Sequence, residues 1–190
     1  MKRVLGKSRA ARRLLAAGVV AGVAGVALTS WTAAGAQTAQ TASSSTPRCS
    51  TRGLEVWLGV GPGGAQAGST SYPMEFTNTS GQRCHLYGYP GVSAELAGHQ
   101  VGSAARRDPA VAPQTVTLAA GATAHTVLRI IDVSALPGCK PVTAAGLKVY
   151  PPGAFSAVEI PFRFRACSVA GPVFLSVQAV QPRVGVPGHS

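Results

Sequence analysis

The chain has 190 residues, 12% of them charged, with 23 Gly and 14 Pro, a composition that excludes long charge-rich helices and favours short elements joined by tight turns. Six of its 17 basic residues precede an apolar N-terminal run, so eleven basic and six acidic residues, a net charge of +5, remain beyond Ala36. This mildly basic remainder is compatible with a polyanionic partner, but it is not the signature of a nucleic-acid-binding domain.

Residues 1–36 predict a signal peptide. A basic start leads into the apolar stretch Leu14–Leu28, and Ala34-Gly35-Ala36 supplies the small residues that precede a cleavage site, here before Gln37. The alternative is an uncleaved anchor helix, because the apolar run extends to 18 residues and just reaches spanning length. General secretion and the twin-arginine route are both compatible with the sequence. Residues 37–47 follow as a low-complexity, flexible linker.

Short candidate strands recur over residues 48–182, with turn signals between them, at the spacing expected of a β-sandwich. No window of a dozen residues has a convincing helical period, and only Val133–Leu136 is compatible with one helical turn. The sequence therefore predicts an all-β domain over residues 48–182, with a disordered tail at residues 183–190. The expected strands are Leu54–Val60, Ser71–Asn78, Arg83–Tyr89, Val92–Leu96, Thr115–Leu118, His125–Asp132, Leu147–Tyr150, Phe155–Phe164 and Phe174–Val180.

The stretch Phe76–Val92 is interpreted as a β-hairpin. Its first strand places Phe76 and Asn78 on one face, and the run from Asn78 to Gly81 is typical of a turn. The returning strand, Arg83–Tyr89, alternates apolar and polar residues and ends at Pro90-Gly91, because proline cannot donate to a strand ladder.

Four cysteines follow the predicted signal peptide. An even number in an exported domain predicts two disulfides, for which three connectivities are possible. We predict the pairing of sequence neighbours, Cys49 with Cys84 and Cys139 with Cys167. Each bridge would close a loop of about 30 to 36 residues and stabilise the fold by roughly 3–4 kcal/mol. Zinc is the alternative, but no two cysteines have the close spacing of a zinc knuckle.

Several segments resemble the secreted actinobacterial domain-of-unknown-function family 4232. They are Arg48-Cys49 before a strand, the run Asn78–Val92, the turn Leu118–Ala124, and the region Gly146–Pro152. The turn departs from the family in having Ala120 where proline is usual. The resemblance covers nearly the whole stretch from residue 48 to residue 180. It implies an immunoglobulin-like antiparallel β-sandwich outside the cell membrane, and it implies no activity or catalytic residue.

Two short motifs have an alternative structural explanation. Gly59–Gly64 has the pattern G-x-G-x-x-G, but a dinucleotide site needs a helix after it, and the following residues have no helical period. We interpret it as an exposed loop between strands. Asn78-Thr79-Ser80 matches a glycosylation acceptor, but its role in the turn already explains these residues.

Histidine chemistry is the enzymatic or metal-binding alternative. His85 and His125 together with Met74 could form a copper or zinc site if their strands converge. A histidine oriented by Asp108 or Asp132 could serve as the base of a hydrolytic protein. The sequence contains no H-x-H, H-E-x-x-H or G-x-S-x-G pattern. We therefore predict no catalytic residue, no cofactor and no metal ligand.

Basic residues offer a different kind of site. The alternation in Ile160–Arg165 places Arg163 and Arg165 on the face opposite Phe162 and Phe164. The alternative is a solvated strand face without a partner. The predicted binding surface consists of Arg129, Lys148, Arg163 and Arg165, with Arg106-Arg107 as further candidates.

These patterns together predict a secreted or cell-wall-associated β-sandwich that binds or has a structural role without catalysing a reaction. The few acidic residues in the predicted mature chain leave little to oppose a basic surface. The expected partner is an anionic wall polymer or an envelope protein, and we expect neither a nucleic-acid partner nor a transmembrane segment in the mature chain.

Overall fold

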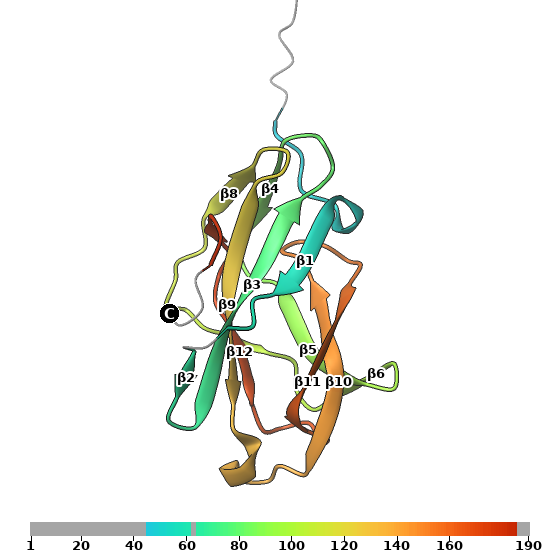
Figure 1. The fold of residues 1–190 in the computed structure, drawn as a ribbon, viewed down its shortest axis with the longest axis vertical. Coiled ribbons are helices and arrows are strands. Elements are labelled where there is room, and N and C mark those ends of the chain that lie inside the picture. The colour runs from blue at the N-terminus through green and yellow to red at the C-terminus, as the bar shows by residue number, and fades with distance from the viewer. Residues whose placement is uncertain (1–44, 62–63, 186–190) are drawn as a thin grey trace, which may run out of the picture. The chain divides into compact units, whose positions relative to one another are not determined.

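Strands dominate the computed structural model, which describes residues 45–61 and 64–185 (Figure 1). The described residues also contain two single turns of 3-10 helix, Thr51–Gly53 before the first strand and Val133–Ala135 between the ninth and tenth. The strands are β1 Leu54–Leu58, β2 Ala65–Gln66, β3 Ser69–Asn78, β4 Cys84–Tyr87, β5 Gly91–Leu96, β6 His99–Val101, β7 Arg106–Arg107, β8 Thr115–Leu118, β9 Thr123–Ile131, β10 Pro141–Tyr150, β11 Val158–Cys167, β12 Leu175–Val177 and β13 Gln181–Pro182.

The larger sheet has seven strands, in the order β1-β3-β9-β12-β7, with β2 beside β3 and β13 beside β9. Strand β3 is its central element, because it pairs with β9 over nine residues and with β1 over five. The alternation of β3 sends Met74 and Phe76 into the core, where both are fully buried. Pro73 and Glu75 therefore point to the outer face of this sheet.

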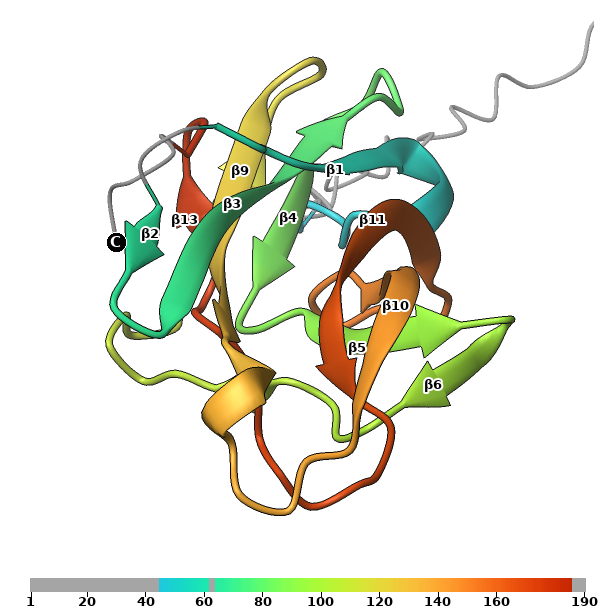
Figure 2. The ribbon, with the colours of Figure 1, turned by 60° about the horizontal axis from the view of Figure 1, so that its bottom comes forward.

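The smaller sheet has four strands, in the order β11-β10-β5-β6. Figure 2 shows this sheet on one side of the molecule and β2, β3 and β9 on the other. On β11, Ile160 is buried, Phe162 and Phe164 are partly buried, and the two arginines between and after them are exposed. This confirms the apolar-in, basic-out interpretation of the strand.

Side chains from both sheets form one hydrophobic core. Phe76 and Leu128 from the larger sheet belong to the same buried cluster as Val92, Leu147 and Ile160 from the smaller one. Burying each such side chain contributes about 1.5–3 kcal/mol. The prediction of an all-β sandwich with two disulfides is thus confirmed; the finer assignment to an immunoglobulin-like topology stays a prediction.

The predicted hairpin is wrong. Strand β4 does not return along β3; it pairs with β8 in a separate two-stranded sheet, Cys84 opposite Leu118 and Tyr87 opposite Thr115. Strand β3 has both edges occupied, by β9 on one side and by β1 and β2 on the other, so no edge is left for β4. The turn at Asn78 therefore carries the chain from one sheet to another.

Several predicted boundaries also change. Strand β10, for example, begins at Pro141 and not at Leu147. Strand β11 begins at Val158, and Phe155 lies before it with its side chain fully exposed. Residues 183–185, assigned to the disordered tail, lie against the outer face of the larger sheet: the Arg183 carbonyl lies 2.9 Å from Nδ1 of His125, and Gly185 N donates to Glu75. Strand β13 positions them by pairing with β9.

The predicted signal peptide at residues 1–36 lies outside the described residues, as do most of the linker and residues 186–190. Among residues 45–61 and 64–185, no helix is long and apolar enough to cross a membrane.

Candidate functional site

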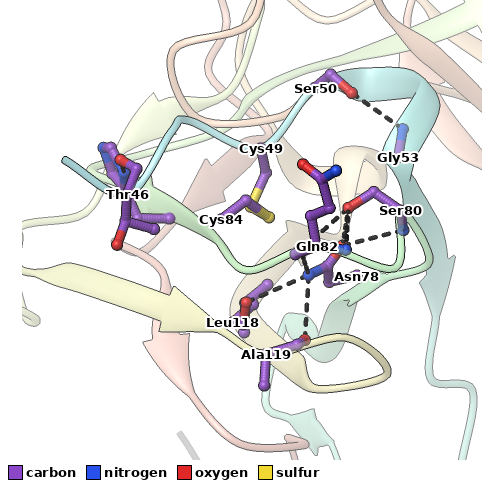
Figure 3. The surroundings of a disulfide bond; sticks show 11 residues. Thr46, Cys49, Ser50, Gly53, Asn78, Ser80, Gln82, Cys84, Leu118 and Ala119 are labelled. Carbon is purple, nitrogen blue, oxygen red and sulfur yellow. Dashed lines mark hydrogen bonds between the residues drawn. A yellow bond between two sulfur atoms is a disulfide. The ribbon is translucent and has the colours of Figure 1, made fainter. Parts of the chain in front are cut away.

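The turn after β3 is held together by a buried amide. The Asn78 side chain is fully buried, and its Nδ2 donates to the carbonyls of Gln82, Leu118 and Ala119 (Figure 3). Its Oδ1 accepts from both the backbone N–H and the hydroxyl of Ser80. Asn78 therefore has a structural role, and its burial is incompatible with glycosylation in the folded protein.

A disulfide lies next to this turn. Cys49 is bonded to Cys84 at the start of β4 (Figure 3), and the chain before β1 runs beside that strand. The backbone N–H of Cys49 donates to the His85 carbonyl, and the N–H of His85 donates to the carbonyl of Pro47. The second disulfide, Cys139–Cys167, joins the segment after the Val133–Ala135 turn to the end of β11. Both bridges pair sequence neighbours.

The glycine-rich segment lies between strands. Gly59 N donates to the Pro73 carbonyl and Ser71 N donates to the Gly64 carbonyl, so both ends of the loop are tied to β3. A Cβ at Gly64 would clash with the Ser71 carbonyl oxygen, so this position requires glycine for close backbone approach. The segment is followed by strand β2 and not by the helix that a dinucleotide site requires.

The structure does not bring the candidate metal ligands together. Met74 points into the core, whereas its neighbour Glu75 pairs with His125 on the outer face of the same sheet. His85 lies on β4, with Nδ1 2.9 Å from the Thr46 carbonyl oxygen. Within residues 45–61 and 64–185, no group of three or more His, Cys, Asp or Glu side chains is placed to hold a metal ion.

Three of the four predicted binding residues lie on the outer face of the smaller sheet, and the fourth lies on the larger sheet. Arg163 and Arg165 are exposed on β11 of the smaller sheet. Lys148 lies on β10 directly opposite Glu159, so an acidic neighbour offsets its charge. Arg129 is exposed on β9 of the larger sheet. The structure therefore separates Arg129 from the other three residues, whose role in binding stays a prediction. Alternation along a strand gives the face of that strand but not the sheet to which it belongs.

Strand pairing instead places Arg129 in a row with Arg106. Ser71 on β3 pairs with Arg129, Arg129 pairs with Ser176 on β12, and Ser176 pairs with Arg106 on β7. Registered residues of neighbouring strands point to the same face, so the two arginines flank a small serine on the outer face. With about 5 Å between strands, their Cα atoms are about 10 Å apart. We call Ser71, Arg129, Ser176 and Arg106 the arginine row.

Both arginines of the row are exposed, and Ser176 is buried between them. Arg129 is oriented by its Nε, which donates to the Ser69 hydroxyl at 2.9 Å. A hollow of about 230 Å³ lies beside Arg129 and Ser71, and Asp108 also lines it. The Asp108 carboxylate accepts from Ala110 N at 3.0 Å. This part of the surface has two guanidinium groups and one carboxylate, so its net charge is positive.

A buried carboxyl group lies further along the same face. Glu75 is fully buried beneath residues 183–185; its Oε1 accepts from Gly185 N at 2.8 Å, and Oε2 has no hydrogen-bond partner among the described residues. Burial raises the pKa of Glu75 from 4.5 to about 7, although the bond from Gly185 partly opposes the rise. No sequence signal indicated this burial, because Glu75 alternates with core residues on a strand whose outer face looks solvated.

Comparison with models of known protein families shows to which family this β-sandwich domain belongs. The sequence model of DUF4232, a domain of unknown function, matches residues 49–181. Because the match spans well over half of the chain, the protein belongs to this family, and the family resemblance noted from the sequence is confirmed. Searches among curated proteins and among solved structures gave no match.

Proposed function

We propose that this domain is a non-enzymatic binding module of the cell envelope and that it binds an anionic wall polymer through the arginine row. The observation that carries the proposal is the pairing of β9, β12 and β7, which aligns Arg129 and Arg106 on one exposed face. Guanidinium groups bind carboxylates and phosphates through two parallel hydrogen bonds. Two such groups, on strands separated by β12, suit a ligand with repeated anionic groups.

Other features support an extracellular binding role. Both disulfides belong to the folded domain, and such bridges persist in oxidising compartments outside the cytoplasm. The sequence begins with a predicted export signal, which would deliver the domain to the envelope. The positive charge of the predicted mature chain would attract polyanions over a distance comparable to the screening length, about 8 Å at physiological ionic strength.

The test compares two matched double variants of the full exported chain. Arg106→Gln with Arg129→Gln removes the arginine row, and Arg52→Gln with Arg163→Gln removes the same charge from two other exposed positions. Affinity for isolated anionic wall polymer is measured by calorimetry. We expect at least a tenfold loss for the first pair, as for two charge-assisted contacts, and less than a threefold loss for the second.

Two results would contradict the proposal. Equal losses in both double variants would show that net charge, and not the arginine row, governs binding. Binding to vesicles that contain an anionic lipid, without binding to the polymer, would replace the proposed ligand by a membrane surface. Thermal unfolding of both variants should stay close to that of the unmodified protein, because all four side chains are exposed.

A further inference from the structure

A second hollow lies between the two sheets, away from the outer face that carries the arginine row. Its volume is about 350 Å³, at the lower end of the range of about 300–1,000 Å³ typical of ligand sites. It is bounded by the turn between β2 and β3, by the end of β9 and by β11. The lining residues that matter here are Gly68, Tyr72, Ile130, Asp132, Phe164 and Arg165. We call this hollow the inter-sheet cleft.

Aromatic side chains form one wall of the inter-sheet cleft. Tyr72 on β3 contacts Phe162 on β11 edge to face, with ring centroids 5.1 Å apart and planes at 71°. Phe162 in turn stacks on Phe164, with centroids 5.6 Å apart and planes at 27°. All three rings are partly exposed and pack against the core, so the wall is apolar and fixed in place.

Two opposite charges lie on the rim. The pKa of Asp132 is lowered mainly by the backbone N–H of Ser134, then by the Ser134 side chain, and further by the positive charge of Arg165. Asp132 is held in place because it caps the Val133–Ala135 turn and its N–H donates to the Gly68 carbonyl. Arg165 is exposed on β11 and lines the same cleft. The rim therefore has a hydrogen-bond acceptor, Asp132, and a hydrogen-bond donor, Arg165, and their opposite charges give the rim no net charge.

We infer that the inter-sheet cleft binds a single uncharged sugar ring of an envelope glycan. A pyranose ring has an apolar C–H face that fits against the Tyr72 and Phe164 rings, and hydroxyls on its edge that both donate and accept. Asp132 accepts from such hydroxyls and Arg165 donates to them, which fixes the orientation of the ring. Opposite charges side by side disfavour a ligand of either single sign. This inference uses different side chains from the arginine row, although Ser69 lines the cleft and accepts a hydrogen bond from Arg129.

The experiment titrates the full exported chain, labelled with ¹⁵N, with N-acetylglucosamine, glucose and mannose, and follows backbone amide shifts by NMR. We expect saturable shifts at Gly68, Asp132 and Arg165 for at least one sugar, and none at Arg106. Asp132→Asn keeps the turn cap, since Asn caps as well as Asp, but removes the charged acceptor. It should weaken binding about tenfold. The matched control, Glu159→Gln, also removes one negative charge, but from a position on the smaller sheet outside the cleft. It should leave the affinity for the sugar unchanged.

A second variant tests whether the aromatic ring of Tyr72 or its hydroxyl contributes to sugar binding. Tyr72→Phe keeps the ring and its contact with Phe162 but removes the hydroxyl, so it should retain binding within about threefold, as expected when a neutral hydroxyl is lost. Shifts that do not saturate with any of the three sugars overturn the inference. Equal weakening by Asp132→Asn and Glu159→Gln also overturns it, because the cleft would then have no specific role. Saturable binding of glycine but of no sugar would assign the cleft to a zwitterion instead.

Discussion

Replacing Glu75 by Gln tests the burial of a carboxyl group beneath residues 183–185. Gln has the same shape and keeps an oxygen that can accept from Gly185 N, but it cannot ionise. In the unmodified protein the carboxyl is fully buried with one hydrogen bond to Oε1, so ionisation places a negative charge where water does not reach. The variant therefore removes the charge while leaving the packing of β3 unchanged.

The magnitude follows from the pKa of Glu75. A rise from 4.5 to about 7 corresponds to an upper limit of about 3 kcal/mol. Between these two pH values the folded protein holds the proton more strongly than the unfolded chain does. The contribution of Glu75 to stability is thus fully present below pH 4.5 and is lost as the pH rises through 7. The Glu75→Gln variant should gain up to about 3 kcal/mol over the unmodified protein between pH 4 and pH 8.

The assay is urea unfolding of both proteins at several pH values in this range. His125 is the titratable side chain directly opposite Glu75 on β9, and its Nδ1 lies 2.9 Å from the Arg183 carbonyl oxygen. The comparison is therefore repeated in a His125→Gln background, where the effect of Glu75→Gln on stability should persist. A stability difference that is the same at pH 4 and pH 8 would refute the argument, since it would mean that the carboxyl ionises as it does in water.

Three further variants test other parts of the fold. Cys84→Ser should lower the free energy of unfolding by about 2–5 kcal/mol in urea titrations, because one bridge is lost; a loss below about 1 kcal/mol would contradict this. Asn78→Ala should cost about 3 kcal/mol by leaving buried carbonyls unpaired, whereas its exposed neighbour Thr79→Ala should change stability by less than about 0.5 kcal/mol. In Gly185→Ala the new Cβ would lie 2.6 Å from the Cβ of Pro73, so amide hydrogen exchange in β13 should accelerate at least tenfold; unchanged exchange would show that the segment adjusts.

Alternation along the sequence predicted several long strands well, although it missed residues 141–146 of β10. Strand β11 is the clearest case, because Ile160, Phe162 and Phe164 share one face and the arginines share the other. Short strands such as β2 and β13 have two residues each, too few to show any period. The pairing of β4 with β8 was missed because neighbouring segments usually pair, and only the occupied edges of β3 prevent it here.

The candidate sites were harder to predict. Arg129 and Arg106 were both candidates from the sequence, but they are more than twenty positions apart, and their alignment through β12, which pairs with both strands, was not predicted. The inter-sheet cleft likewise combines Tyr72 from one sheet with Phe164 from the other. Such juxtapositions depend on the order of strands that are far apart in the sequence, and local sequence patterns do not indicate this order. The disulfide pairing could be predicted because four cysteines allow only three connectivities.

If the arginine row binds an anionic polymer, the affinity should depend strongly on salt concentration. Affinity of the unmodified protein and of the Arg106→Gln, Arg129→Gln double variant is measured for isolated wall polymer over a series of sodium chloride concentrations. We expect the affinity of the unmodified protein to fall steeply with salt, because exposed charges are screened. The double variant should have both a lower affinity and a shallower slope. Identical slopes for the two proteins would contradict the binding role of the arginine row.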